Sequence, residues 1–152
     1  MEEKPFEEAV RDQCTYWQGV LRLQDWNIQC DVVRAHEMKG DRSPVAQCES
    51  YIRRKDAMVR VLHPMDLLAV SPYFLNGEEK DYDLSLVHEL LHLHFAPFQA
   101  EVDTAADLAQ EQAIESISRA ITKLYRELKA KDTTTTLEAA EAAAEERMGL
   151  YA

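Results

Sequence analysis

Two histidines and a glutamate with a fixed spacing are the residues of this chain best suited to chemistry. His88, Glu89 and His92 form an HExxH match inside the apolar run from Leu84 to Phe95. Residues i and i+4 lie one above the other on a helix, so both imidazoles can converge on a single Zn²⁺. Glu89 would then point at the metal-bound water. The spacing therefore predicts a hydrolytic zinc site with Glu89 as general base.

The residues around this motif predict a helix that is buried nearly all round. Apolar side chains fill the arc that the polar strip leaves free: Leu86, Val87, Leu90, Leu91 and Leu93. Because a buried polar strip is costly without partners, we expect a metal ion to bind it. The alternative is a core helix whose histidines bond to protein groups. The helix should run over about residues 84–96, with Asp81 or Asp83 as a cap and Pro97 as a stop.

The composition fits one globular domain. The chain has 152 residues, of which 46% are hydrophobic, and a net charge of −11. We assign residues 1–131 to this domain and residues 132–152 to a threonine-rich linker followed by an exposed C-terminal helix. The negative charge would repel the phosphate backbone of a nucleic acid. We interpret the one basic run, Arg53 to Lys55, as a solvated hairpin turn. No nucleic-acid partner is expected.

No stretch approaches the roughly 20 apolar residues of a membrane span. The first residues also lack the basic and apolar regions of a signal peptide. We therefore expect no membrane partner and a cytoplasmic location.

Sequence periodicity predicts an α+β fold. Residues 6–23 have the period of an amphipathic helix, and residues 26–32 alternate as a half-buried strand. Residues 45–52 and 57–62 should form a hairpin beside that strand, which gives a small three-stranded, mainly antiparallel sheet. A short helix over residues 65–71 and a loop over residues 72–77 then lead to the HExxH helix.

A long second helix should follow the motif helix. Thr104 to Asp107 can form a capping box, and the helix should continue to about Lys131. Its expected core stripe is Ile114, Ile117, Ile121, Leu124 and Leu128. The C-terminal helix beyond it is peripheral, with a possible contact to a partner protein.

Catalytic zinc sites usually have three protein ligands, so one more is expected downstream. The candidates are His94, Glu101, Asp103, Asp107, Glu111 and Glu115. His94 lies about 200° around the helix from His92 and cannot reach the same ion. Glu101 and Asp103 fall in the expected turn. On the long helix, Glu111 lies about 90° from the centre of the core stripe and Glu115 about 130°, which makes Glu111 the better buried of the two.

At this point the sequence resembles a known family. The motif, eighteen further residues and then Glu111 match the HExxH-x18-E spacing of the gluzincin metallopeptidases. Glu115 resembles the acidic residue that in thermolysin-like enzymes follows the ligand by one turn and supports the first histidine. The order of elements is similar to a minimal zincin fold, as in compact metallopeptidases of phages and mobile elements.

The resemblance implies a zinc metallopeptidase acting on a peptide or protein in the cytoplasm of a bacterium or a phage-infected host. One Zn²⁺ per chain would be held by His88, His92 and Glu111, with Glu115 as a support for His88 or as the alternative ligand. Three residues flanking the motif helix are candidates to stabilise the oxyanion, and spacing does not choose among Tyr73, Tyr82 and His63.

A different class of function fits part of the same pattern. A non-enzymatic, zinc-stabilised module could bind a partner protein through its acidic surface or its C-terminal helix. Purely structural zinc sites are usually closed by four ligands that include cysteine. Cys14, Cys30 and Cys48 are widely spaced and form no CxxC pair, so we interpret them as small core residues. Such a site also has no need of Glu89, which favours the enzyme.

Overall fold

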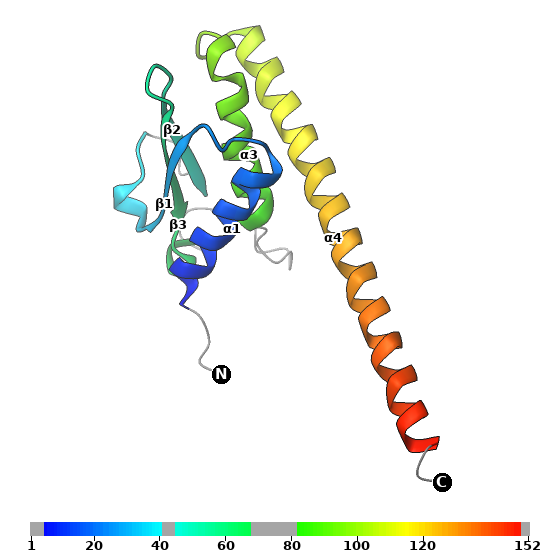
Figure 1. Cartoon of the computed structure of the whole chain (residues 1–152). Coiled ribbons are helices and arrows are strands. Elements are labelled where there is room, and N and C mark those ends of the chain that lie inside the picture. Colours follow the sequence, from blue (N-terminus) through cyan, green and yellow to red (C-terminus); the bar gives the residue numbers. More distant parts are fainter. Residues whose placement is uncertain (1–4, 41–44, 68–81, 150–152) are drawn as a thin grey trace. The chain divides into compact units, whose positions relative to one another are not determined.

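The computed structural model describes residues 5–40, 45–67 and 82–149. The chain divides into two compact units, residues 1–118 and 119–152. In the described ranges the chain is α+β, with three α-helices and a three-stranded sheet (Figure 1). The elements in chain order are α1 (Phe6–Val20), β1 (Asn27–Val33), β2 (Ala46–Tyr51), β3 (Asp56–Leu62), α3 (Tyr82–Phe95) and α4 (Ala105–Gly149). Short 3-10 turns lie at Ala35–Glu37, Pro64–Asp66 and Ala96–Phe98.

The sheet is mixed, with the strand order β1-β3-β2. The predicted hairpin is confirmed, because β2 and β3 pair antiparallel around the exposed turn that holds Arg53 to Lys55. The expectation of a mainly antiparallel sheet is wrong for the other pair, since β1 runs parallel to β3. The long connection between β1 and β2 carries the chain to the far edge, so the hairpin returns β3 between the other two strands.

Helices α1 and α3 pack against the sheet and against each other. The central strand β3 carries the inner layer, where Val59 and Val61 have no exposed surface. Trp17 of α1 is 1% exposed, and its indole Nε1 donates a hydrogen bond of 2.8 Å to Asp83 at the start of α3. Asp83 therefore joins two helices, and Asp81, the other expected cap, lies outside the described residues.

The motif helix α3 lies where the sequence predicts it. Its five predicted apolar residues, Leu86, Val87, Leu90, Leu91 and Leu93, are all buried. The helix ends at Phe95, two residues before Pro97, and a 3-10 turn continues the chain. The predicted helix over residues 65–71 appears only as the 3-10 turn Pro64–Asp66 in the described residues. The rest of that prediction, with the loop over residues 72–77, lies outside them.

Helix α4 begins with the predicted cap. The Thr104 hydroxyl accepts a hydrogen bond of 3.2 Å from the backbone N–H of Asp107. The Asp107 carboxylate accepts from the N–H of Asp103 at 3.1 Å, one residue earlier than a capping box requires.

The predicted core stripe of α4 is correct only at its start. Ile114 is 1% exposed, whereas Ile117 is 39% exposed and Leu124 and Leu128 are about 60% exposed (59% and 62%). Ser118 is fully buried in place of an apolar residue. Its hydroxyl donates to the carbonyl of Glu115 at 2.9 Å, so the polar group is satisfied within its own helix and its burial costs little.

The expected linker over residues 132–136 does not form. α4 is one helix of 45 residues that runs through them. Threonine costs only a fraction of a kcal/mol in a helix, roughly 0.7 at most. Here Thr133, Thr134 and Thr136 each donate to the carbonyl four residues earlier, at 2.8–3.0 Å. Residues 126–149 are exposed, which includes the described part of the C-terminal helix that was expected to be exposed. Among the described helices, none has the length and apolar character to cross a membrane.

The buried face of α3 should dominate the stability of the first unit. Leu90 has no exposed surface, so Leu90→Ala should lower the free energy of unfolding by about 2–5 kcal/mol. The exposed Leu124 offers a matched control, and Leu124→Ala should change it by no more than about 0.5 kcal/mol. Urea denaturation of both variants measures this. Equal losses would contradict the described packing of α3.

Candidate metal centre

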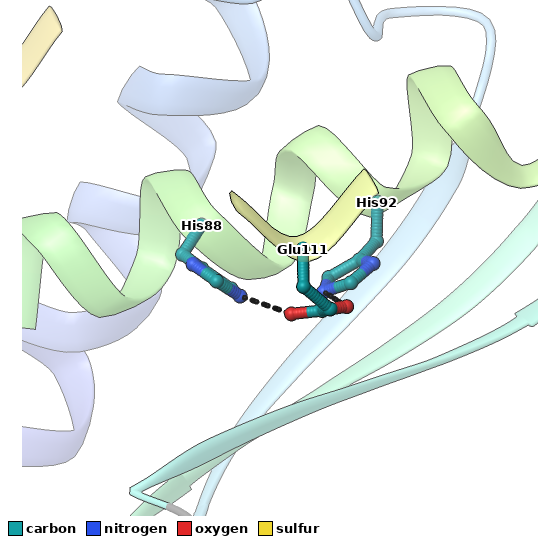
Figure 2. A group of neighbouring side chains, drawn as sticks. All are labelled: His88, His92 and Glu111. Atoms are coloured by element: carbon teal, nitrogen blue, oxygen red, sulfur yellow. Dashed lines mark ion pairs between the residues drawn. The ribbon is translucent and has the colours of Figure 1, made fainter. Parts of the chain in front are cut away.

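Three predicted site residues converge between α3 and the first turns of α4. His88 and His92 project from the same face of α3 toward Glu111 of α4 (Figure 2). The Nε2 atom of His88 lies 3.4 Å from one carboxylate oxygen of Glu111, and Nε2 of His92 lies 3.4 Å from the other. One ligand atom from each residue lies within 4.8 Å of the other two.

These separations fit a bound metal ion. A tetrahedral ion with bonds of about 2.0–2.1 Å holds its ligand atoms about 3.3 Å apart. Both histidine–glutamate distances, 3.4 Å each to a different oxygen of Glu111, are close to this value. Burial lowers the pKa of His92, which keeps the imidazole neutral as a metal ligand must be, and the Glu111 charge opposes that shift. The cluster is therefore a possible metal site.

Glu115 lies behind His88 rather than beside Glu111. Its carboxylate oxygen is 3.0 Å from Nδ1 of His88, the ring nitrogen that faces away from the cluster. A proton on Nδ1 would be donated to Glu115, which leaves Nε2 with its lone pair toward Glu111. The two carboxylates one helical turn apart on α4 therefore contact the two different nitrogens of one imidazole.

Glu89 lies on the adjoining side of α3 and shares a cavity with His92 and strand β2. Burial, together with the nearby charge of Glu111, raises the pKa of Glu89 to about 8. The backbone N–H of Cys48 on β2 donates to the carboxylate and opposes the rise. Glu89 therefore lies between the cluster and strand β2, and its pKa is close to neutral pH.

A cavity of about 180 Å³ opens beside Glu89 and His92. Strand β2 supplies Cys48 and Ser50 to its wall, and Gln110 of α4 supplies another part. The sequence analysis did not identify these three residues. Strand alternation places Cys48 and Ser50 on one face, but the packing of α3 over that face depends on contacts far apart in the sequence.

The other ligand candidates lie elsewhere. His94 bonds through Nε2 to the carbonyl of Leu21 at 2.7 Å, which agrees with its predicted position on another face of α3. Among the described residues, Glu101, Asp103 and Asp107 belong to no group of three potential metal ligands.

The three oxyanion candidates have different positions. His63 accepts a hydrogen bond at Nδ1 from the N–H of Met65, 3.2 Å away, and so caps the turn after β3. Tyr82 packs edge-on against Phe6, with ring centroids 5.0 Å apart, and burial raises its pKa to about 12. Tyr73 lies outside the described residues. None of the described contacts brings His63 or Tyr82 to the cluster.

Comparisons with protein-family models, curated proteins and solved structures find no match to this chain. The resemblance to gluzincins thus remains a prediction, and the chemistry of the site has to be judged from its geometry.

The cluster predicts that the folded chain binds one divalent transition-metal ion. His88→Ala and His92→Ala should each abolish binding, because two remaining ligands cannot hold the ion. His94→Ala is the matched control on the same helix and should retain it. Equilibrium dialysis followed by elemental analysis measures the metal per chain. Metal-free wild type after dialysis against excess Zn²⁺, or metal loss in His94→Ala alone, would contradict the assignment.

Proposed function

We propose that this protein is a zinc-dependent metallopeptidase with a minimal zincin fold of the gluzincin type. The observation that carries the proposal is the convergence of His88, His92 and Glu111, with Glu89 on the adjoining side of the same helix. The cavity beside Glu89 supports it further, since a hydrolase needs room for substrate next to its base.

The donor set favours zinc in a catalytic role. Two imidazole nitrogens and one carboxylate oxygen are the ligands of many catalytic zinc sites, in which the fourth position stays open. Zn²⁺ bound there would supply a Lewis acid that makes water a nucleophile near neutral pH and polarises a carbonyl oxygen. Glu115 would keep the His88 ring in the orientation and tautomer that this ligand set requires.

Glu89 is the general base of the proposed reaction. It would take a proton from the attacking water and pass it to the leaving amine as the peptide bond breaks. Its contact with the Cys48 N–H fixes the carboxylate between the cluster and β2, so one oxygen can face the reacting atoms while β2 holds the side chain. Burial and the charge of Glu111 raise its pKa and that N–H opposes them, which brings the pKa to about 8, near the range in which proton transfer both ways is efficient.

Among the described strands β2 pairs only with β3, so its outer edge is suited to an extended peptide. In the β2–β3 ladder the N–H of Leu62 bonds directly to the carbonyl opposite it, on Val45. Because such pairs alternate in an antiparallel ladder, the backbone groups of Ala46, Cys48 and Ser50 point away from β3. The Cys48 N–H is used by Glu89, so a peptide added as a new strand would bond beside the general base.

The two carboxylates of α4 should differ in their effect on zinc. Glu111→Gln removes a ligand charge, whereas Glu115→Gln leaves all three ligands and weakens only the support of His88. We therefore expect a loss of about 10- to 100-fold in zinc affinity for Glu115→Gln and a larger loss for Glu111→Gln. Competition with a chromophoric chelator measures both. The reverse order would make Glu115 the ligand.

Glu89→Gln should separate hydrolysis from metal binding. The amide keeps the shape of the side chain but cannot act as a base, so cleavage should fall by about 10²- to 10⁴-fold. Zinc content and melting temperature should stay close to wild type. The assay incubates zinc-loaded wild type and Glu89→Gln with a random peptide library and detects new termini by mass spectrometry.

A chelator-treated sample controls for contaminating proteases of other classes. New termini that are equally abundant with Glu89→Gln would rule out the proposed role of this residue. If neither protein produced termini while both bound zinc, a zinc-stabilised module that binds a partner protein would be the better explanation.

A further inference from the structure

The cavity beside Glu89 is lined by polar side chains as well as by an aromatic ring. Ser50 of β2 contributes a hydroxyl, and Gln99, just after the 3-10 turn that follows α3, contributes an amide. Phe95 supplies an aromatic surface. Among the described residues, no lysine or arginine lines it, and Glu89 is the one carboxylate there. Because a reacting peptide bond must lie next to Glu89, the cavity adjoins a side chain of the bound substrate.

The polar side chains that line the cavity differ in whether they already form hydrogen bonds. Gln110 is fixed at both ends of its amide: Nε2 donates to the Phe98 carbonyl at 2.7 Å, and Oε1 accepts from the Ala100 N–H at 3.3 Å. Within the part of the chain that the structure describes, no hydrogen bond occupies the Ser50 hydroxyl or the Gln99 amide. These two groups offer both donors and acceptors to a ligand.

Size and charge restrict what can enter. A volume of about 180 Å³ is close to that of an engineered cavity of roughly 150 Å³ that holds benzene, so one side chain of moderate size fits. An acidic side chain would lie beside the Glu89 carboxyl group, and none of the described lining residues is a lysine or arginine. An aliphatic one would displace water from the half-buried Ser50 hydroxyl and the exposed Gln99 amide without replacing their hydrogen bonds, which lowers its affinity.

We infer that this cavity is a specificity pocket for an uncharged, amide-bearing side chain, glutamine or asparagine, next to the hydrolysed bond, and that Ser50 and Gln99 determine this preference. The inference rests on the proposed function for its place in a reaction, but binding tests it without catalysis.

Affinity selection of peptides provides the test. The bait is the full chain carrying Glu89→Gln, loaded with zinc and immobilised, which should hold peptides without cleaving them. Peptides selected from a random library should be enriched about tenfold or more in glutamine or asparagine at one fixed position. Adding Ser50→Val and Gln99→Leu should abolish that preference while the zinc content stays the same. Gln47→Leu, on the opposite face of β2, is the matched control and should keep it.

The outcomes separate the pocket from the chemistry. Selected peptides that lack an amide preference, that favour aliphatic or basic side chains, or that keep the preference in the Ser50/Gln99 double variant would overturn the inference, as would no selection at all. If the amide preference is found but wild type leaves the selected peptides intact, the pocket assignment holds and the proposed hydrolysis fails.

Discussion

The first unit depends on how the polar strip of α3 is satisfied inside the fold. His88, Glu89 and His92 stand on a helix whose neighbours Leu86 and Leu90 have no exposed surface, so the helix cannot turn its polar side to water. Buried polar groups without partners cost several kcal/mol. The partners come from two directions, with carboxylates from α4 on one side and the backbone of β2 on the other. These contacts fix the first turns of α4 and the edge of the sheet against α3.

The same contacts create an imbalance of charge that favours a cation. Glu89, Glu111 and Glu115 all lie around two imidazoles, and His92 is kept neutral by burial. Burial raises the pKa of Glu89, and the charge of Glu111 raises it further. A dication between His88, His92 and Glu111 would offset that repulsion. The proposed metal binding would therefore also lower the proton affinity of Glu89.

Local patterns predicted the residues of the cluster because helix geometry is local. The i and i+4 spacing sets His88 and His92 on one face whatever the rest of the chain does. The phase of α4 favoured Glu111 as a ligand, but the expectation that Glu111 is better buried than Glu115 is wrong, since its side chain is 46% exposed and that of Glu115 is 39% exposed. The same reasoning placed His94 away from the cluster. The linker prediction failed for a local reason as well, because threonine hydroxyls can bond back to helix carbonyls and four in a row do not end a helix.

Features that depend on distant contacts could not be predicted. The parallel pairing of β1 with β3 follows from a crossover whose path leaves no period in the sequence. The burial of Ser118 in place of Ile117 depends on which side of α4 meets the rest of the first unit. The contact between Glu89 and the Cys48 N–H joins residues 41 positions apart, and the cavity beside it needs β2, α3 and α4 together. Strand alternation alone gives the face of Cys48 but not what covers it.

X-ray absorption at the zinc K-edge of the zinc-loaded protein reports directly whether two histidines and one glutamate form an open zinc site. The account predicts a first shell of nitrogen and oxygen only, at about 2.0–2.1 Å, with the outer-shell scattering of two imidazoles. A sulfur atom at about 2.3 Å would mean that Cys48 or another cysteine closes the site. That result, or a shell with fewer than two imidazoles, would contradict the account.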